Sequence, residues 1–455
     1  MDAILRRLSE FARDLRFEDL PVDVVHASKR ALVDSFGCAF GAFDTTPAVI
    51  ARGLTENATT GQGATVLGTG IRTMPDLAAF ANGVMIRCLD FNDTFECQGG
   101  GGHPSDYIPA VLAAAERGDT SGRSLITGIV IAYEIFCRMT EATNFAFGCW
   151  DHVTNGAIAS AAAAAAVLDL GTEEIGNAIS MATVSGIALH EARIGNLTMW
   201  KGCASASACR NGVFVAMLAA DGMTAPGTPF AGRHGFFTAV SGAFDPPEFA
   251  GSAHPFSISA CDFKSYPSGY FSQTAIEAAI EVRAQLPSLD GIETIDVGTS
   301  PFGLKVMAGD EEKWSPTSRE SADHSLPYTV AATLLYGDLG VGHFDAERLR
   351  DRRLLSLLRR VSVREDPASV SVWPEATLNS VTVTTEGGKR YSSAVKYHRG
   401  HHLNPLTDAE LESKFHRQTI GQLVDADRTS LLEAIWTLDE VEHVSELLMR
   451  TQRKQ

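Results

Sequence analysis

The first 260 residues carry the spacing of amphipathic helices. Apolar side chains recur three and four positions apart, as at Val24, Ala27, Ala31 and Leu32, and this interval places them on one face of a helix. The same reasoning predicts helices over residues 105–117, 122–140, 155–168, 173–189 and 204–221. We find no strand-like alternation of any length in this part of the chain. We therefore expect it to be all helical.

Small side chains dominate these expected helices. Residues 159–166 read Ala-Ser-Ala-Ala-Ala-Ala-Ala-Ala. Helices that present small residues to one another can approach closely, because the distance between axes depends on the side chains at the contact. The most apolar run, residues 157–168, is too short to span a bilayer. The pattern predicts a tightly packed helical core.

The pattern changes near Cys261. Residues 291–297 form a short β-type run, and residues 380–385 and 389–395 flank Glu386-Gly387-Gly388, a typical hairpin turn. A further strand is expected at 360–364, with helices at 272–285, 321–335 and 345–358. After residue 407 the chain turns helical again, over 408–417, 425–432 and 438–450.

These elements predict a mostly α fold of two domains. The two ends of the chain, residues 1–260 and 401–455, would form a large helical domain, and residues 261–400 a smaller α+β domain inserted in it. Clefts between two such domains are common ligand sites.

Composition and charge narrow the class of protein. Of 455 residues, 45% are hydrophobic and 20% charged, as in an ordinary globular protein. The formal net charge of -17 argues against nucleic acid and anionic membranes as partners. An anionic small molecule would need a local cluster of Lys, Arg and His. The eight cysteines include no Cys-x-x-Cys, so we expect reduced thiols in the cytoplasm or in an organelle matrix.

One stretch combines acid/base groups with glycines. Asp90, Asp93 and Thr94 leave an apolar helical run, four glycines follow, and then comes His103. Glycine permits backbone conformations closed to other residues, so the tract can bring His103 back toward Asp90. Ser105 suits the N-cap of a following helix, whose free N–H groups would attract an anion. The stretch predicts an acid/base site for a carboxylate substrate, although a surface loop whose aspartates cap helices would give the same pattern.

Three further residues could contribute to such a site. His152 precedes the alanine-rich helix, Lys201 stands beside Gly202 ahead of a small-residue helix, and Lys264 lies at the junction of the two expected domains. A lysine near a helix N-terminus suits carboxylate binding, because it adds a point charge to the helix dipole. The alternatives are a structural histidine and solvated lysines.

Two polar segments fall in the expected α+β domain. Residues 319–328 are dense in polar groups yet run into an apolar helix, so they form either a buried network or one wall of a site. Tyr328 at their end could supply a phenol proton. The second segment is Tyr397-His398-Arg399-Gly400-His401-His402. No carboxylate or Cys stands at ligand spacing beside its histidines, so we predict no metal site.

Several of these segments, taken in order, resemble the MmgE/PrpD family, whose members include 2-methylcitrate dehydratase, cis-aconitate decarboxylase and iminodisuccinate epimerase. The resemblance covers nearly the whole chain. It rests on Leu89-Asp90-Phe91-Asn92-Asp93-Thr94, His103-Pro104-Ser105, Lys201, Phe263-Lys264 with Tyr266-Pro267, Ser272-Gln273-Thr274-Ala275, residues 322–328, and Arg399-Gly400 with residues 404–408.

The resemblance implies a large helical domain with a smaller α+β lid inserted in it, a homodimer, and a site between the two domains. It also implies catalysis without a metal or an organic cofactor. The family's polar site residues map onto Asp90, Thr94, His103, His152, Lys201, Lys264 and Tyr328. The chain departs from the family after Pro267, where relatives usually place an ionisable or hydrogen-bonding residue and this chain has Ser268-Gly269-Tyr270-Phe271.

The function that the resemblance implies is a cofactor-independent lyase acting next to a carboxylate of a di- or tricarboxylic acid. That chemistry builds negative charge on carboxylate oxygens, which Lys201 and Lys264 would stabilise. His103 is expected to transfer the proton, with Asp90 and Thr94 orienting it or the substrate. A 2-methylcitrate dehydratase-like hydro-lyase is favoured. The alternatives are a cis-aconitate decarboxylase that forms itaconate, an epimerase of an iminodisuccinate-type substrate, and a non-catalytic tricarboxylate-binding relative.

Overall fold

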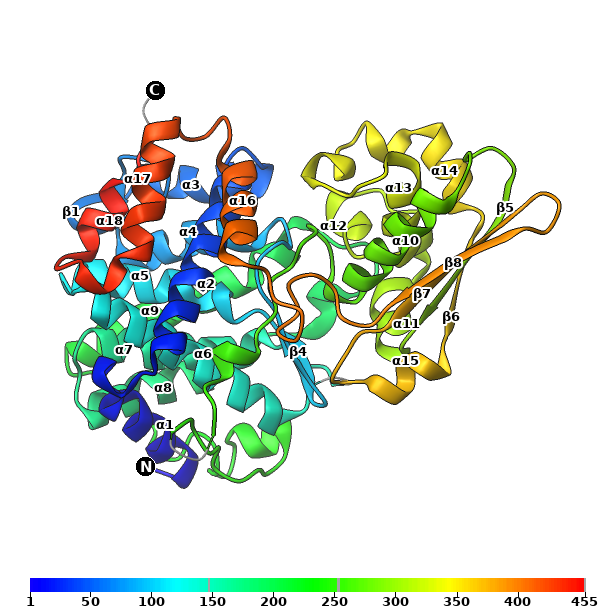
Figure 1. The fold of residues 1–455 in the computed structure, drawn as a ribbon. Helices are drawn as coiled ribbons and strands as arrows, with labels where there is room; N and C mark the ends of the chain where they lie inside the picture. Colours follow the sequence, from blue (N-terminus) through cyan, green and yellow to red (C-terminus); the bar gives the residue numbers. More distant parts are fainter. Residues whose placement is uncertain (146–147, 252–253, 454–455) are drawn as a thin grey trace.

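The fold was analysed in a computed structural model that describes residues 1–145, 148–251 and 254–453. Most of the chain is helical, and Figure 1 shows a larger helical part beside a smaller part that carries a sheet. The helices of the larger part are α1 (Ala3–Asp14), α2 (Val22–Gly41), α3 (Thr46–Glu56), α4 (Pro75–Arg87), α5 (Ile108–Arg117), α6 (Gly122–Thr143), α7 (Val153–Val167), α8 (Thr172–Ser185), α9 (Ala204–Ala220), α16 (Asp408–Thr419), α17 (Asp425–Trp436) and α18 (Val444–Met449).

Helix α7 lies at the centre of the larger part. Every residue of α7 from position 153 to 165 is buried, so neighbouring helices cover it on all sides. Small residues permit this packing: a Cβ added at Gly212 of α9 would clash with Ser160 of α7, and one at Gly83 of α4 would lie 2.9 Å from the Cβ of Ala206. The alanine-rich face therefore brings helix axes close together, as its sequence predicts.

The smaller part packs helices against a four-stranded sheet. Its strands are β5 (Ile292–Thr299), β6 (Val361–Glu365), β7 (Asn379–Thr385) and β8 (Arg390–Val395), in the spatial order β6-β5-β7-β8. Strands β5 and β6 are parallel and the other pairs antiparallel, with Val297 opposite Val381. Its helices are α10 (Gln273–Gln285), α11 (Pro301–Ala308), α12 (Arg319–Ala322), α13 (Leu326–Tyr336), α14 (Arg352–Leu358) and α15 (Pro367–Val372).

Two separate groups of buried apolar side chains underlie the two parts. One runs from Ile4 to Cys261 and resumes at Leu406, and the other lies between Phe271 and Tyr391. The chain crosses between the parts twice, and the crossings touch, since the N–H of Phe263 donates to the carbonyl oxygen of Gly400 at 2.8 Å. Gly400 has φ of +104°, and a side chain there would clash with the Phe263 carbonyl, so glycine is required.

The mostly helical class is confirmed, while the expectation of no strands before residue 260 is wrong. Strand β1 (Thr59–Thr65) pairs with β2 (Arg72–Thr73), and β3 (Phe95–Cys97) pairs with β4 (Gly100–Gly102). These pairs are too short, and too rich in glycine and threonine, to alternate between apolar and polar residues. The division into domains at residues 260 and 400 remains a prediction. No helix within the described ranges has both the length and the apolar character needed to cross a bilayer.

Candidate active site

The candidate site is centred on Asp90, directly after helix α4. Asp90 has φ of +52°, a left-handed conformation that is uncommon outside glycine, and its N–H donates to the carbonyl oxygen of Arg87 at 3.0 Å. The turn ends the helix and points the carboxylate back into the protein, where it is fully buried. A strained aspartate that carries a buried charge is typical of a functional position.

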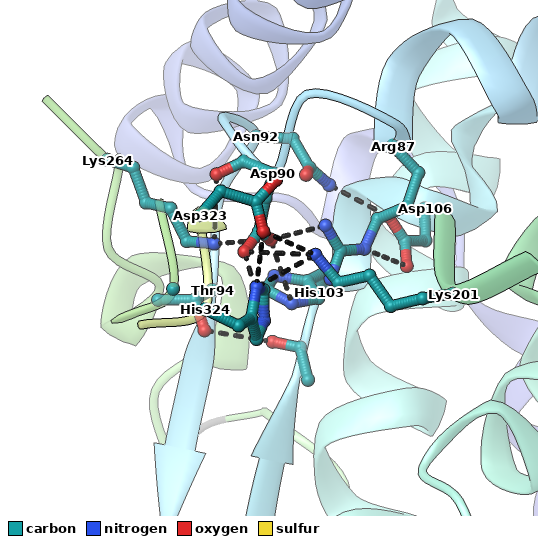
Figure 2. A network of polar contacts seen from close by, with 12 residues as sticks. Arg87, Asp90, Asn92, Thr94, His103, Asp106, Lys201, Lys264, Asp323 and His324 are labelled. Atoms are coloured by element: carbon teal, nitrogen blue, oxygen red, sulfur yellow. Dashed lines mark hydrogen bonds and ion pairs between the residues drawn. The ribbon is translucent and has the colours of Figure 1, made fainter. Parts of the chain in front are cut away.

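Five cationic or imidazole side chains, His103 among them, converge on the Asp90 carboxylate (Figure 2). Arg87 donates to Oδ1 through Nη1, and Lys264 Nζ lies 2.9 Å from the same oxygen. Lys201 Nζ and His324 Nε2 lie 3.4 Å and 3.2 Å from Oδ2. Burial alone would raise the pKa of Asp90, but the charges of Arg87, Lys201 and Lys264 hold it well below its usual range. Asp90 is therefore an anion at neutral pH.

Burial acts on the pKa of the lysines in the opposite sense to that of Asp90, because it disfavours the charged form of each group. Burial lowers the pKa of Lys264 to about 8, although the charge of Asp90 acts against that shift. Burial likewise lowers the pKa of Lys201, which Asp323 and Asp90 oppose. Lys264 is therefore mostly a cation at neutral pH, and both lysines are buried, where charge is poorly screened.

His103 presents a free ring nitrogen to this cluster. Its Nδ1 lies 2.6 Å from the backbone carbonyl oxygen of Asp93, and its Nε2 lies 3.8 Å from Asp90 Oδ1. A carbonyl oxygen only accepts hydrogen bonds, so Nδ1 carries the proton and Nε2 is left as a base. Burial, together with the charges of Arg87 and Lys264, lowers the pKa of His103 well below its usual range. The neutral imidazole is suited to accept a proton.

A pocket of about 230 Å³ opens beside these residues. Both parts of the protein line it. The larger part contributes Arg87, Asp90, Glu96, residues 99–103, Thr140, Phe145, Trp150, His152, His190, Arg193 and Ile194, and the smaller part adds Lys264, residues 269–271, Phe302, residues 305–307, Asp310 and His324. A larger open groove of about 1110 Å³, near residues 68–71 and 446–453, contains none of the cluster.

Arg193 and His152 form a second polar wall of the pocket. The Arg193 guanidinium binds the buried Asp151 carboxylate through two nitrogens and lies 3.4 Å from His152 Nε2. Burial lowers the pKa of His152 to about 3, against the effect of Asp151. The rings of His152 and His103 meet edge to face, with centroids 5.8 Å apart. His152 is therefore a neutral group beside the expected base.

Buried Lys414 of helix α16 fixes the backbone on which the site stands. Its Nζ donates to Asp34 Oδ1 at 2.6 Å and to the carbonyl oxygens of Phe91 and Lys264 at 2.7 Å and 2.8 Å. The last two oxygens belong to the loop after Asp90 and to the first crossing segment. One ammonium near the C-terminus thus ties together the two segments that carry Asp90 and Lys264.

The structure brings most of the sequence-predicted residues together. Asp90, His103, Lys201 and Lys264 form the cluster of Figure 2, and His152 lines the pocket. Thr94 lies beside them as a support, because its backbone exchanges two 2.8 Å hydrogen bonds with that of Asp262 and its hydroxyl donates to Gly102 O at 3.2 Å.

Tyr328 and Ser105 differ from the expectation. The Tyr328 hydroxyl donates to the carbonyl oxygen of His343 at 2.6 Å, within the core of the smaller part, and does not line the pocket. Ser105 is not an N-cap, since residues Pro104–Tyr107 form a 3-10 turn and α5 begins at Ile108. The Ser105 N–H donates to Asp93 Oδ1 and the Asp106 N–H to His103 O, so neither is free for an anion.

Sequence reasoning gave no role to several polar residues of the pocket, among them Arg87, Glu96, Arg193 and His324. Arg87 is a single arginine at the end of an apolar helical run. This placement is the one feature of the sequence that predicts its burial. His324 lies in the polar segment 319–328, for which the sequence predicts a buried network or one wall of a site, and His324 belongs to both. Glu96 and Arg193 carry no local pattern.

Among the residues that the structure describes, two groups of side chains have the donors for a metal ion. Asp90, Asp323 and His324 place ligand atoms within 4.8 Å of one another, but Arg87, Lys201 and Lys264 already occupy the same carboxylate region and would repel a divalent cation. Asp262, His401 and His402 form the second group. Its carboxylate comes from a distant segment, so reasoning from local ligand spacing was incomplete. Asp262 already accepts from Tyr270 at 2.6 Å and from His402.

Comparisons with known proteins agree on one family. Residues 6–248 match the MmgE/PrpD N-terminal domain and residues 266–439 match the MmgE/PrpD C-terminal domain. The chain is 30% identical to a 2-methylcitrate dehydratase of Salmonella typhimurium over 396 residues, which cover 81% of this chain and 80% of that protein. It is 26% identical to the cis-aconitate decarboxylase of Homo sapiens over 440 residues, 93% of this chain and 89% of that protein.

Proposed function

The chain belongs to the MmgE/PrpD family, and from this premise we propose that it is a lyase acting on the carbon next to a carboxylate of a di- or tricarboxylic acid. The reaction we favour is dehydration of a 2-methylcitrate-type substrate without a metal or an organic cofactor. The observation that carries the proposal is the neutral His103 beside a buried cluster of Arg87, Lys201 and Lys264. This arrangement pairs a base with stabilising charges.

In the proposed reaction His103 Nε2 removes the proton from the carbon next to the carboxylate. Negative charge then develops on the carboxylate oxygens, and the fixed cations Lys201 and Lys264 stabilise it. Asp90 holds these two lysines and Arg87 in place before substrate arrives, so little reorganisation is needed at the moment of reaction. Arg193, at the far wall, can bind a second carboxylate of the substrate through its planar guanidinium.

A substrate panel tests this function. Purified protein is incubated separately with 2-methylcitrate, citrate, cis-aconitate and iminodisuccinate, and the unsaturated product, CO2 and change in optical activity are followed. Formation of an unsaturated acid from 2-methylcitrate is the expected result. Release of CO2 from cis-aconitate would favour a decarboxylase, and racemisation an epimerase. Binding without turnover of any of the four would favour a non-catalytic relative.

We propose further that residues 261–400 act as a lid over the pocket of the helical domain formed by residues 1–260 and 401–455. The support is that each part has its own apolar core and that both line the pocket. Limited proteolysis with and without bound citrate tests the idea. Substrate should protect the two crossing segments near residues 262–268 and 396–404, and equal cleavage rates would contradict lid closure.

We propose that two copies of the chain associate through the end of α8 and the face of α9. Val184, Leu189, Trp200 and Phe214 are each about half exposed, and the last three line one groove. Apolar side chains gathered in this way mark an interaction surface. Sedimentation of wild type at micromolar concentration should give a dimer, and Phe214→Asp should shift it toward monomer. Val370→Asp, on an exposed valine of α15, is the matched control. A wild-type monomer would refute the interface.

A further inference from the structure

We propose that the natural substrate carries an alkyl chain longer than a methyl group and that this chain binds to an apolar wall of the pocket. The inference rests on the proposed function, because it concerns the same pocket and a substrate of the same polycarboxylate class. The new element is the alkyl substituent that the substrate carries in addition to its carboxylates.

The apolar wall is built from two elements of the smaller part. Phe271 lies in the 3-10 turn Tyr270–Ser272 that precedes α10, and helix α11 contributes Phe302, Val306 and Met307. The same helix also brings Lys305 to the pocket lining. The rings of Phe271 and Phe302 stack at an interplanar angle of 7° with centroids 6.4 Å apart. None of the four apolar side chains offers a hydrogen-bond donor to an oxygen of the substrate, so a carboxylate held against them would lose its hydration without compensation.

The wall adjoins the charged cluster through Gly269. The Gly269 N–H donates to the carbonyl oxygen of Asp323 at 2.8 Å, and Asp323 contacts His324 Nδ1 at 2.6 Å. On its other side a Cβ at Gly269 would lie 2.6 Å from Met307 Sδ. The absence of a side chain at Gly269 lets Met307 pack directly against this backbone, so the apolar wall begins next to the segment that carries His324. Lys264, His324 and Met307 line the same pocket, so a substrate whose reacting carboxylate lies at Lys264 and His324 can extend along α11.

A series of 2-alkylcitrates tests the inference, with kcat/KM measured for citrate and its methyl, ethyl, propyl and butyl derivatives. Burial of each methylene on the wall should raise kcat/KM by roughly 4- to 10-fold up to at least the propyl derivative. A maximum at citrate or 2-methylcitrate would overturn the inference and leave the proposed function standing. Turnover of no member would instead overturn the proposed function.

A pair of matched variants places the alkyl chain on this wall. Val306→Asp puts a charge where the alkyl chain should bind, so kcat/KM should rise less from one 2-alkylcitrate to the next. Val370→Asp changes a valine of similar exposure outside the pocket, and it should keep the wild-type series. A rise that is the same in Val306→Asp as in wild type would show that the chain binds elsewhere.

An independent observation, the surroundings of Glu96, carries a second inference about the same proposed reaction. We propose that Glu96 donates the proton that the departing hydroxyl group takes up. His103 Nε2 receives the proton from carbon, the C–O bond breaks with its electron pair going to oxygen, and that oxygen takes the Glu96 proton and leaves as water. A C=C bond forms, Glu96 becomes a carboxylate, and His103 an imidazolium. Proton exchange with solvent restores both.

The geometry of the glycine-rich hairpin supports this role. Glu96 on β3 faces Gly101 on β4 and lines the pocket. A side chain at Gly101 would clash with the Glu96 carboxyl group, so this glycine makes room for it. The Thr94 hydroxyl lies 3.5 Å from Glu96 Oε1 and 3.2 Å from Gly102 O. Since Thr94 has one hydroxyl proton and Gly102 O can only accept it, a protonated Glu96 satisfies the second contact.

The charges around Glu96 differ from those around Asp90. Within the described residues no Lys, Arg or His nitrogen lies within 4 Å of the Glu96 carboxyl group, whereas Asp90 has five such partners. Burial raises the pKa of Glu96 to about 8; the charge of Lys264 lowers it and that of Asp262 raises it. Two carboxyl groups whose environments separate their pKa values in this way divide the roles of anion and proton donor.

A comparison of leaving groups tests Glu96. Glu96→Gln should lower the rate on the hydroxy acid by about 100-fold or more, yet by less than about tenfold on an analogue in which chloride replaces the hydroxyl, because chloride leaves without a proton. His103→Ala, the matched control, should lose rate on both substrates. Equal losses of Glu96→Gln on the two substrates, or no loss on the hydroxy acid, would overturn the inference, while the wild-type reaction would still stand.

Discussion

The Nδ1 atom of His103 lies 2.6 Å from the backbone carbonyl oxygen of Asp93. This contact fixes the tautomer, because the carbonyl can only accept, and it leaves Nε2 as the basic atom that faces Asp90. The glycine-rich hairpin between these two residues closes the chain on itself, so a backbone oxygen ten residues earlier orients the ring.

Replacement of His103 by alanine should lower kcat by roughly two to four orders of magnitude, because the base for proton removal is lost. Steady-state kinetics on the best substrate of the panel measures the effect. His443→Ala, which alters an exposed histidine paired with Asp119, should leave the rate unchanged. A nearly normal His103→Ala enzyme would end the assignment.

Asp90→Asn should destabilise the protein by about 3–5 kcal/mol, because it leaves Arg87, Lys201 and Lys264 buried without their shared anion. Asparagine tolerates the left-handed backbone at this position, so the change isolates the charge. Urea unfolding measures the free energy of unfolding. The control Asp425→Asn removes an exposed partner of Arg428 and should cost less than about 1 kcal/mol. Equal effects would contradict the role of Asp90.

The pH profile of kcat/KM should be flat near pH 6.5 and fall as the pH rises through about 8. His103 is already neutral at about pH 6.5, since burial lowers its pKa well below the usual value. Lys264, whose pKa burial lowers to about 8, loses its charge as the pH rises through that value. Glu96, whose pKa burial raises to about 8, loses its proton in the same interval.

Two ionisations in one interval should make the alkaline limb steeper than a single titration. Glu96→Gln should be a slower enzyme, and the alkaline limb of its kcat/KM profile should have the slope of a single ionisation, that of Lys264. An alkaline limb centred near pH 10.5, the ordinary value for lysine, would show that Lys264 is not held as the contacts require.

Dialysis against a chelator should leave the activity unchanged, because the proposed steps use only protein side chains. The rate before and after dialysis, and after addition of Zn²⁺ or Fe²⁺, provides the measurement. A loss that one of these ions restores would contradict cofactor independence and direct attention to Asp262, His401 and His402.

The sequence could predict the part of the site whose residues lie close together in the chain. Asp90 and His103 lie thirteen positions apart with glycines between them, so their meeting follows from the flexibility of the tract. Lys201 and Lys264 required the family resemblance, because nothing in their neighbours distinguishes them from solvated lysines. Arg87 and His324 meet Asp90 only through the tertiary fold.

The predicted helix start and side-chain role were wrong where a contact with a residue distant in the sequence decides them. The helix expected from Ser105 begins at Ile108 because the Asp93 carboxylate captures the Ser105 N–H. Tyr328 lies in an apolar helix as predicted, but its hydroxyl binds the His343 carbonyl, a contact that the sequence of α13 does not encode. The hairpin of the smaller part was predictable, since Gly387 and Gly388 adopt the positive φ that its turn requires.

Lys414 has a consequence for biosynthesis. The ammonium that joins Phe91 to Lys264 stands 150 residues after Lys264 in the chain, so the catalytic centre stays unfinished until long after its last proposed acid, base or cation has been translated. A nonsense mutation shortly before this codon would abolish activity although every proposed acid, base and cation had already been made.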